Sequence, residues 1–365
     1  MGTILVVSDY ANIVSARPEA ELFISLHRRG WKLIMLIPSS SPWLSRFKEE
    51  GMLVESYEIK GRRHPEEVER MTSILHAYDV KLMLLFNNRV VVNGIKAAKN
   101  HPVRVVVYRG SVGNLHWYDP TSYLKVLHPR VDGVLCLHEA VKAHIDQQAK
   151  FRKLQTEVMR KGHKSEWYKD IKPFSPSAFN LPDDGFFIVF VGNVRRVKGL
   201  IYLLKATKWL AKNPSVHLLL IGKGMDKEPY ERAINESSMS NRIHRLGFRS
   251  DALRIVAMSQ VLVLPSLRSE ALTKAVQEAM QLAVCPVITD IPGNRGLVIE
   301  KQCGRVVPIK KERALGEALL HCSLHPEETK QMGKAAQQHI RTWLSHEQTI
   351  AMAEHALRSF LSVTK

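Results

Sequence analysis

The chain has 365 residues, of which 45% are hydrophobic and 24% are charged, and its formal net charge is +18 at pH 7. These fractions are typical of a folded α/β protein and exclude a low-complexity chain, and at this length two domains are expected. No apolar run approaches the roughly 18 residues that a membrane-spanning helix needs.

Apolar runs alternate with amphipathic stretches through the first half of the chain. The runs rich in Val, Leu and Ile, which we predict to be buried strands, are residues 3–7, 32–37, 80–86, 103–108 and 133–137. The stretches with apolar residues at helical spacing are residues 19–29, 65–76 and 139–148. This alternation favours right-handed βαβ units and a parallel sheet that helices cover on both faces.

The alternation stops and then resumes. Between residues 149 and 185, prolines, glycine turns and mixed charges are typical of a linker. Strand-like runs then return, each followed by a helical segment, at residues 186–191, 217–221 and 261–265. We therefore predict two doubly wound, Rossmann-like domains with a cleft between them, an N-terminal one at residues 1–175 and a C-terminal one at residues 176–344. Residues 327–365 are mostly helical by pattern.

The stretch from Val261 to Asn294 carries the clearest chemistry. A strand ends at Pro265, and a helix is expected to begin near Ala271. The backbone N–H groups at such a helix start are free to donate to a diphosphate or to sugar oxygens, and the helix dipole assists them. The candidate donors are Ala271, Leu272 and Thr273.

Two carboxylates flank this helix start. Glu270 lies at the helix mouth, where a carboxylate can accept hydrogen bonds from two sugar hydroxyls. Glu278, two turns further, can accept from a ribose diol. The alternative is that Glu270 is an ordinary N-terminal helix charge and Glu278 a solvated side chain.

This stretch resembles the E-x7-E element of the retaining GT-B glycosyltransferases of family four, the glycosyl transferases group 1 type. The matching residues are Ser269-Glu270, Lys274–Met280 (KAVQEAM), Pro286–Asp290 (PVITD) and Gly293-Asn294. The resemblance implies that Glu270 contacts the transferred sugar and Glu278 the ribose of the donor. It also implies the GT-B fold, with residues 345–365 as a helix that crosses back to the N-terminal domain.

Residues 190–199, FVGNVRRVKG, resemble the phosphate loop of the same family. Relatives have an arginine after the glycine of this loop, whereas here Asn193 follows Gly192. Cations at this turn can stabilise a departing nucleotide diphosphate without a metal, although a solvated cationic turn is the alternative. The candidates are Lys198, which matches the family directly, Arg195, which could replace the missing arginine, and Arg196.

Residues 217–224 and 241–248 resemble the next two strands of the family. In relatives the backbone at the end of the second of these strands contacts the base, which points here to Leu246 and Gly247. Backbone contacts do not select a base by side chain, so the donor base and sugar stay open.

The N-terminal half offers weaker candidates for the acceptor side. The loop at residues 8–21 lacks the Gly-Gly turn of many relatives, and Arg17 in it is either an anion contact or an exposed cation. Residues 108–130 have the polar and aromatic composition of a binding loop. Its acceptor-side candidates are Ser111, Asn114, His116 and Asp119. Arg109 stands where relatives have a histidine near the reacting carbon, and it is a catalytic candidate that could bind an acceptor phosphate or assist the leaving group. The alternatives are a packed His116 and an N-cap role for Asp119.

Other chemistries lack their motifs. The sequence contains no D-x-D, H-E-x-x-H, G-x-S-x-G or P-loop pattern, and we expect neither a metal nor another cofactor. The scattered cysteines, Cys136, Cys285, Cys303 and Cys322, are typical of reduced thiols in a cytosolic protein. The first ten residues favour a buried strand over a signal peptide.

We therefore predict a metal-independent, retaining hexosyltransferase that uses a nucleotide diphosphate sugar. Residues 1–180 carry 27 Lys and Arg against 18 Asp and Glu, and the remainder 26 against 17, so the positive charge belongs to both halves. Such charge favours an anionic, membrane-borne acceptor, for example a lipopolysaccharide core or a lipid-linked oligosaccharide. Aromatic and basic residues at 42–48 and 117–130 are candidates for a membrane-facing patch, which predicts a cytoplasmic protein at the inner face of the membrane.

Three alternatives stay open. A nucleotide-sugar epimerase or hydrolase could share the fold, and so could a noncatalytic nucleotide-binding protein. A nucleic-acid-binding protein would also explain the positive charge, although the sequence contains no recognised nucleic-acid motif.

Overall fold

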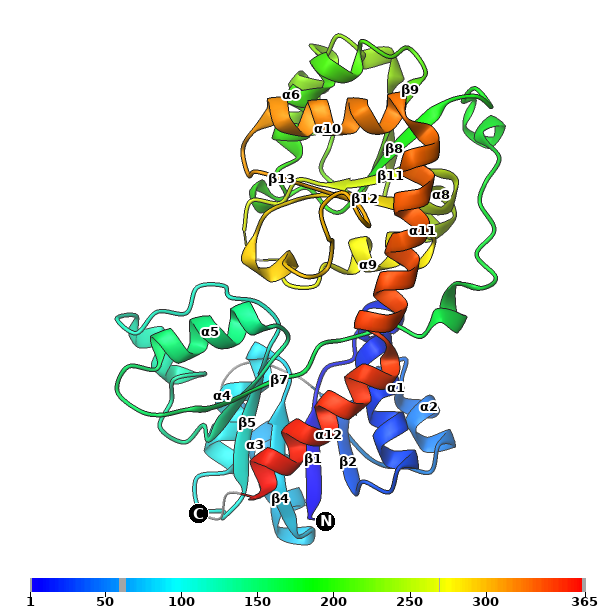
Figure 1. Cartoon of the computed structure of the whole chain (residues 1–365). Coiled ribbons are helices and arrows are strands. Elements are labelled where there is room, and N and C mark those ends of the chain that lie inside the picture. Colours follow the sequence, from blue (N-terminus) through cyan, green and yellow to red (C-terminus); the bar gives the residue numbers. More distant parts are fainter. Residues whose placement is uncertain (1, 59–63, 269, 363–365) are drawn as a thin grey trace. The chain divides into compact units, whose positions relative to one another are not determined.

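The structure, a computed structural model, describes residues 2–58, 64–268 and 270–362 (Figure 1). The chain folds into two compact units. Unit 1 consists of residues 1–162 and 346–365, and unit 2 of residues 163–345. The sequence pattern placed the boundary between residues 175 and 176, whereas residues 163–175 lie in unit 2.

Unit 1 is built on a parallel sheet in the order β3-β2-β1-β4-β5-β6-β7. Its strands are β1 (Thr3–Val7), β2 (Leu33–Pro38), β3 (Leu53–Tyr57), β4 (Val80–Leu85), β5 (Arg104–Arg109), β6 (Gly133–Cys136) and β7 (Gln155–Val158). The strand order reverses between β1 and β4, which is the switch point of a doubly wound sheet. Ligands of such sheets bind at the carboxyl ends of the strands beside this point.

The helices of unit 1 pack on this sheet. They are α1 (Ile13–Arg28), α2 (Leu44–Glu49), α3 (Pro65–Ala77), α4 (Asn88–Ala97), α5 (Glu139–Gln148), α12 (His346–Ser362) and the 3₁₀ helix η1 (Pro120–Leu124). Side chains of α1, α2 and α12 share one hydrophobic cluster with residues of β1, β2 and β4. Residues 4–7 of β1 are fully buried, as expected for the centre of a parallel sheet.

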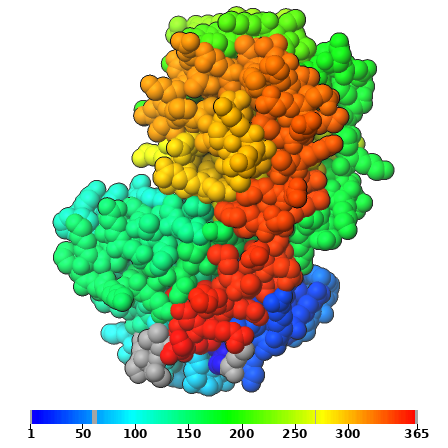
Figure 2. All heavy atoms as spheres, in the orientation of Figure 1, coloured from blue at the N-terminus to red at the C-terminus, as the bar shows by residue number. Residues whose placement is uncertain are grey.

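The C-terminal helix α12 completes the core of unit 1. Its apolar residues recur at helical spacing on one face and end in Phe360, whose ring is fully buried. Gly133 of β6 leaves space for that ring, because a Cβ atom there would lie 2.5 Å from Cε1 of Phe360. The opposite face of α12 is exposed and forms part of the surface drawn in red in Figure 2.

Unit 2 has a parallel sheet in the order β10-β9-β8-β11-β12-β13. Its strands are β8 (Phe186–Val191), β9 (Val216–Ile221), β10 (Ile243–Gly247), β11 (Val261–Leu264), β12 (Cys285–Thr289) and β13 (Arg305–Val307). Its helices are α6 (Leu200–Leu210), α7 (Tyr230–Asn235), α8 (Ala252–Met258), α9 (Lys274–Gln281), α10 (Glu312–Leu324) and α11 (Pro326–Trp343). The 3₁₀ helices among its described residues are η2 (Ser165–Tyr168), η3 (Pro176–Phe179), η4 (Arg196–Lys198), η5 (Ser240–Arg242) and η6 (Pro292–Asn294). The switch point lies between β8 and β11.

The α/β architecture with parallel sheets is confirmed, but some elements were missed or misplaced. The edge strands β3, β7 and β13 were missed, and β7 lies inside the predicted linker. The helix α1 begins at Ile13 rather than at residue 19 and contains Pro18. Asn12 starts this helix early, because its side chain accepts hydrogen bonds from the N–H groups of Val14 and Ser15.

Candidate functional site

The switch point of unit 2 brings together the two loops that the sequence analysis singled out. One loop connects β8 to α6 and the other connects β11 to α9. Gly199 has a φ of 68°, and a Cβ atom there would lie 1.9 Å from the carbonyl oxygen of Pro265. The N–H of Leu267 donates to the carbonyl of Val197 over 2.7 Å. Glycine is therefore required for the two loops to lie backbone to backbone.

An ion pair between Lys198 and Glu270 joins these loops. Nζ of Lys198 lies 2.7 Å from Oε1 of Glu270, and the two side chains are only 11% and 13% exposed. The hydroxyl of Thr273 lies 3.3 Å from the second oxygen of Glu270 and 3.1 Å from Oδ1 of Asn294. The structure thus brings together the cation and the carboxylate that the sequence predicted for one site.

The start of helix α9 differs from its prediction. The helix begins at Lys274 rather than near Ala271, and Leu272 has the left-handed φ of 48°. The N–H of Leu272 donates to the carbonyl of Gly293 over 2.9 Å, so the prediction of a free donor at Leu272 was wrong. By helix geometry, the N–H groups of Lys274 and Ala275 lack intrahelical acceptors. Ser269 of the sequence motif lies outside the described residues.

Gly293 fixes the position of Glu270. A Cβ atom at Gly293 would lie 1.7 Å from the carbonyl oxygen of Glu270, so no larger residue fits without moving that loop. This contact places the segment after β12 against the β11–α9 loop. The paired G-N motif of the sequence therefore serves as a packing surface for the loop that carries Glu270.

Glu278 lies on the second turn of α9 and forms an ion pair with Lys274, one turn earlier. Its side chain is only 12% exposed. Burial raises the pKa of Glu278 above its usual value, and the neighbouring Lys274 opposes this shift. Glu278 is therefore not the solvated side chain that the alternative interpretation of the sequence assumed.

Asn193 connects the loop after β8 to the loop after β9, at the carboxyl ends of these neighbouring strands. Its side-chain oxygen accepts a hydrogen bond from the N–H of Lys223 over 3.0 Å, and Val194 donates from its N–H to the carbonyl of Lys223. A Cβ atom at Gly222 would lie 2.2 Å from the carbonyl oxygen of Gly192. Where relatives have an arginine, this chain has Asn193, whose side-chain amide binds the backbone of the neighbouring loop at Lys223.

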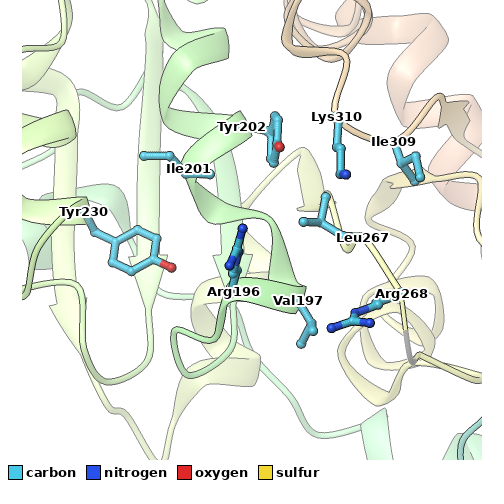
Figure 3. Close-up of a pocket in the computed structure, with 9 residues that line it drawn as sticks. All are labelled: Arg196, Val197, Ile201, Tyr202, Tyr230, Leu267, Arg268, Ile309 and Lys310. Atoms are coloured by element: carbon cyan, nitrogen blue, oxygen red, sulfur yellow. The ribbon is translucent and has the colours of Figure 1, made fainter. Parts of the chain in front are cut away.

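The remaining cations of the β8–α6 loop are exposed. Arg195 precedes η4, and Arg196 lines a cavity together with Arg268 (Figure 3). Within the described ranges neither Arg195 nor Arg196 forms an ion pair with a carboxylate. The structure therefore pairs only Lys198 of the three predicted cations with Glu270.

A cavity of about 820 Å³ lies at the ends of β8, β9 and β10. Asn193, Gly222 and Gly247 are among its lining residues, whereas the partly buried Leu246 is not. The carbonyl of Gly247 accepts a hydrogen bond from the N–H of Gly222. Phe248 is 68% exposed at the rim, with Nζ of Lys223 5.5 Å from its ring centre.

In unit 1, Arg109 folds back on its own loop. Its Nε donates to the carbonyl of Ser111 over 2.9 Å, and a second nitrogen donates to the carbonyl of Val112 over 3.0 Å. Burial lowers the pKa of Arg109, although not enough to neutralise a guanidinium. Arg109, Ser111 and Asn114 line one cavity of about 360 Å³.

The other acceptor-side candidates lie on or near this loop. His116 stacks on Tyr118 with ring centres 5.1 Å apart. Asp119 caps η1 by accepting from the N–H and the hydroxyl of Thr121, and these hydrogen bonds lower the pKa of Asp119. The contacts of His116 are therefore those of a packed side chain, and the contacts of Asp119 are those of an N-cap. Arg17 lies on α1 and is exposed.

Sequence reasoning missed a buried ion pair at the ligand edge of unit 1. Nζ of Lys161 lies 2.5 Å from Oε2 of Glu19 and 4.1 Å from the ring centre of Tyr108. Burial disfavours the charge on Lys161, but Glu19 and Tyr108 outweigh it and raise the pKa of Lys161. The apolar neighbours of Glu19 in α1 were a signal, but Lys161 was assigned to the linker.

The two predicted membrane-facing segments differ in exposure. The prediction for residues 42–48 was wrong, because Trp43 and Phe47 are buried in the core of unit 1. Residues 117–130 do carry exposed apolar side chains, with Tyr118 at 66% and Leu124 at 49%. In the part of the chain that the structure describes, no helix is both long and apolar enough to span a membrane.

Two doubly wound parallel sheets in separate units define the GT-B class of architecture. The described residues contain no cluster of three or more His, Cys, Asp or Glu side chains that could hold a metal ion. A protein of Rickettsia africae whose structure is described as a glycosyltransferase has the same fold, with a TM-score of 0.81, 17% identity and 99% of each chain covered. An Anabaena protein solved in complex with UDP-glucose matches with a TM-score of 0.78 and 17% identity, over 98% of this chain and all of that one.

Residues 172–339, a little under half of the chain, match the sequence model of the family described as Glycosyl transferases group 1, and this match confirms the family resemblance of the C-terminal half. A phosphatidyl-myo-inositol mannosyltransferase of Mycolicibacterium smegmatis is 28% identical over 157 residues, which are 41% of this chain and 40% of that protein. This chain matches less than half the length of the curated relatives with which it aligns.

Proposed function

We propose that the chain is a retaining, metal-independent glycosyltransferase that uses a nucleotide diphosphate sugar. The observation that carries the proposal is the Lys198–Glu270 ion pair at the switch point of a group 1 domain. A lysine beside the donor phosphates can stabilise the departing diphosphate, and a carboxylate beside it can accept from sugar hydroxyls. The UDP-glucose complex of the Anabaena structure supports a donor of this chemical class.

The reaction we propose exchanges one bond for another at the anomeric carbon. The bond from this carbon to the diphosphate oxygen breaks, and the acceptor hydroxyl oxygen forms a new bond on the same face. The acceptor proton passes to the departing phosphate, so no side-chain base is needed. Lys198 and the free N–H groups at the start of α9 stabilise the leaving charge, and Arg195 approaches it from the exposed side of its loop.

The donor positions follow from the same arrangement. Glu278 accepts from the ribose, and the backbone at Leu246 and Gly247 faces the base beside the larger cavity. Arg109 acts as a positioning residue for the acceptor loop, because its donors hold the carbonyls of Ser111 and Val112.

We further propose an anionic, membrane-borne glycan or glycolipid acceptor, reached at the cytoplasmic face of the membrane. The net charge of +18 supports this class, and the name of the mycobacterial relative identifies an anionic lipid for that protein. Exposed aromatic residues of unit 1 also support it. Trp117 and Phe151 contact each other with ring centres 6.0 Å apart, and Nζ of Lys150 lies 4.2 Å from the Trp117 ring.

The first test is a calorimetric titration of the purified protein with UDP, GDP, ADP and their sugar conjugates, without metal and with EDTA. We expect saturable binding of one nucleotide diphosphate that Lys198→Ala weakens at least tenfold by loss of the phosphate contact. Lys205→Ala, an exposed lysine on the following helix, is the matched control. Transfer should then give a product with the anomeric configuration of the donor.

Three results would contradict the proposal. Binding of none of these nucleotides would remove the donor site. Consumption of the sugar nucleotide at the same rate without acceptor would point to the hydrolase or epimerase alternative. Salt-sensitive binding of DNA or RNA in place of nucleotides would favour a nucleic-acid-binding protein.

A further inference from the structure

A second cavity of unit 2, of about 570 Å³, is lined in part by the two loops that carry Lys198 and Glu270 (Figure 3). Neither of those two residues lines it. Its walls come from the β8–α6 connection, the start of α7, the β11–α9 loop and the segment after β13. All of these segments belong to unit 2, so the cavity is complete within that unit.

Three cations reach this cavity from three segments. They are Arg196, Arg268 and Lys310, and among the described residues that line the cavity there is no carboxylate. Within the described parts of the chain none of the three forms an ion pair. Three like charges around one space repel one another, and an anion bound between them would relieve that repulsion. The charge therefore selects an anionic ligand.

Backbone contacts hold the loops that carry two of these cations. The hydrogen bond from Leu267 to Val197 and the close approach of Gly199 to Pro265 fix the two loops that carry Arg196 and Arg268. Lys310 has a φ of 59°, which is uncommon for a residue with a side chain and costs free energy unless the surroundings hold it. A backbone held in this way reduces the entropy that ligand binding would cost.

The rest of the lining is apolar or aromatic. Ile201, Leu267 and Ile309 supply aliphatic surface, while Tyr202 and Tyr230 add rings with hydroxyl groups. A volume of about 570 Å³ lies within the usual range of small-molecule sites and is much larger than a single phosphate. A phosphate or diphosphate joined to an apolar group would satisfy both parts of the lining.

We propose that this cavity is a second anion site, which binds a phosphate or diphosphate ester other than the donor nucleotide. The ester is either the head group of a lipid-linked diphosphate or a free phosphorylated metabolite, and the phosphate chemistry is common to both. The arrangement of Arg196, Arg268 and Lys310 carries the proposal. It does not depend on the transferase activity proposed above, because Lys198 and Glu270 form a separate cluster.

The test uses calorimetry on the full chain at saturating UDP, with inorganic pyrophosphate and geranyl diphosphate as probes. We expect saturable binding of one or both probes in the presence of UDP. The double variant Arg268→Gln/Lys310→Gln should weaken this binding at least tenfold and change UDP affinity by less than twofold. Lys311→Gln removes an exposed neighbouring charge that does not line the cavity, and it should leave probe affinity unchanged.

The two probes separate the two sources of the ester. Geranyl diphosphate binding at least tenfold more tightly than pyrophosphate supports a lipid-linked head group, whereas equal affinities support a free metabolite. Three outcomes overturn the proposal: no binding of either probe, equal affinity in the wild type and the double variant, or competition between the probes and UDP. Loss of UDP binding alone would contradict the donor site and leave this second site standing, so the two proposals fail separately.

Discussion

At the residue scale, Lys198 and Glu270 illustrate how a sequence pattern becomes a site. They lie 72 positions apart in sequence, yet β8 and β11 are neighbours in the sheet and their loops end at the same edge. Removing two charges from water is costly, and their mutual attraction offsets that cost only while both are present. The pair therefore keeps a cation and a carboxylate fixed where a diphosphate sugar is proposed to bind.

Removing one partner of this pair should affect both catalysis and stability. Lys198→Met should lower turnover by about 10²- to 10³-fold, because the leaving diphosphate loses its cation. It should also lower the free energy of unfolding by about 3–5 kcal/mol, because Glu270 is left as an unpaired, largely buried charge. The double variant Lys198→Met/Glu270→Gln should regain much of this stability and no activity, as chemical denaturation and a transfer assay would measure. Equal stability of the single and double variants would contradict the account.

The pKa of Glu278 predicts a pH dependence of donor binding. Burial raises this pKa above its usual value of 4.5, and only the ionised carboxylate accepts from both ribose hydroxyls. The affinity for UDP should therefore fall as the pH is lowered through the raised pKa, and Glu278→Gln should give a weaker and flatter profile.

The free energy of unfolding should depend on pH in the opposite direction to UDP affinity. The folded state holds a proton on Glu278 more tightly than the unfolded state, so wild-type protein should lose stability relative to Glu278→Gln as the pH rises through the same range. Calorimetric titrations and urea unfolding over a pH series measure the two effects. A wild-type profile as flat as that of the variant would exclude Glu278 as the titrating group.

At the element scale, helix α9 shows why its first residue could not be predicted. A strand, a polar turn and a helical pattern were visible in the sequence, but the left-handed Leu272 was not. Its conformation depends on the hydrogen bond from its N–H to Gly293, a residue of a different loop. Local patterns do not contain such tertiary contacts, and the free donors of the helix start therefore move to Lys274 and Ala275.

Helix α12 should contribute strongly to the stability of unit 1. Phe360→Ala should lower the free energy of unfolding by about 3–5 kcal/mol, because it leaves a cavity in the core. Gly133→Ala should also destabilise unit 1, since its Cβ would overlap the Phe360 ring. Together the two changes should cost less than the sum of their separate effects, because the added methyl group fills part of the cavity. Urea unfolding measures these effects, with His355→Ala on the exposed face of the helix as control.

At the scale of the whole molecule, the central strands of the parallel sheets were predictable, whereas both edge strands of unit 1 were not. Central strands such as β1 and β8 are continuous apolar runs, because helices cover both faces of a parallel sheet. The edge strand β7 has Gln155 and Glu157 in its four residues, and β3 is partly exposed, so neither gives such a run. The acceptor-side residues were less predictable still, because the contacts of Arg109 and Lys161 depend on loop conformation and on tertiary packing.

Positive charge and exposed aromatic residues together predict reversible membrane association. Trp117 and Phe151 are 37% and 73% exposed, and aromatic rings beside lysines are suited to the interface of an anionic bilayer. The protein should sediment with vesicles that contain phosphatidylglycerol and much less with neutral phosphatidylcholine vesicles, and 0.5 M salt should release it, since ions screen the attraction. Trp117→Ala/Phe151→Ala should weaken binding at least fivefold, while Phe248→Ala, which removes a ring of unit 2 that is 68% exposed, should not. Equal loss in both variants would show that general hydrophobicity, rather than this patch, holds the protein on the membrane.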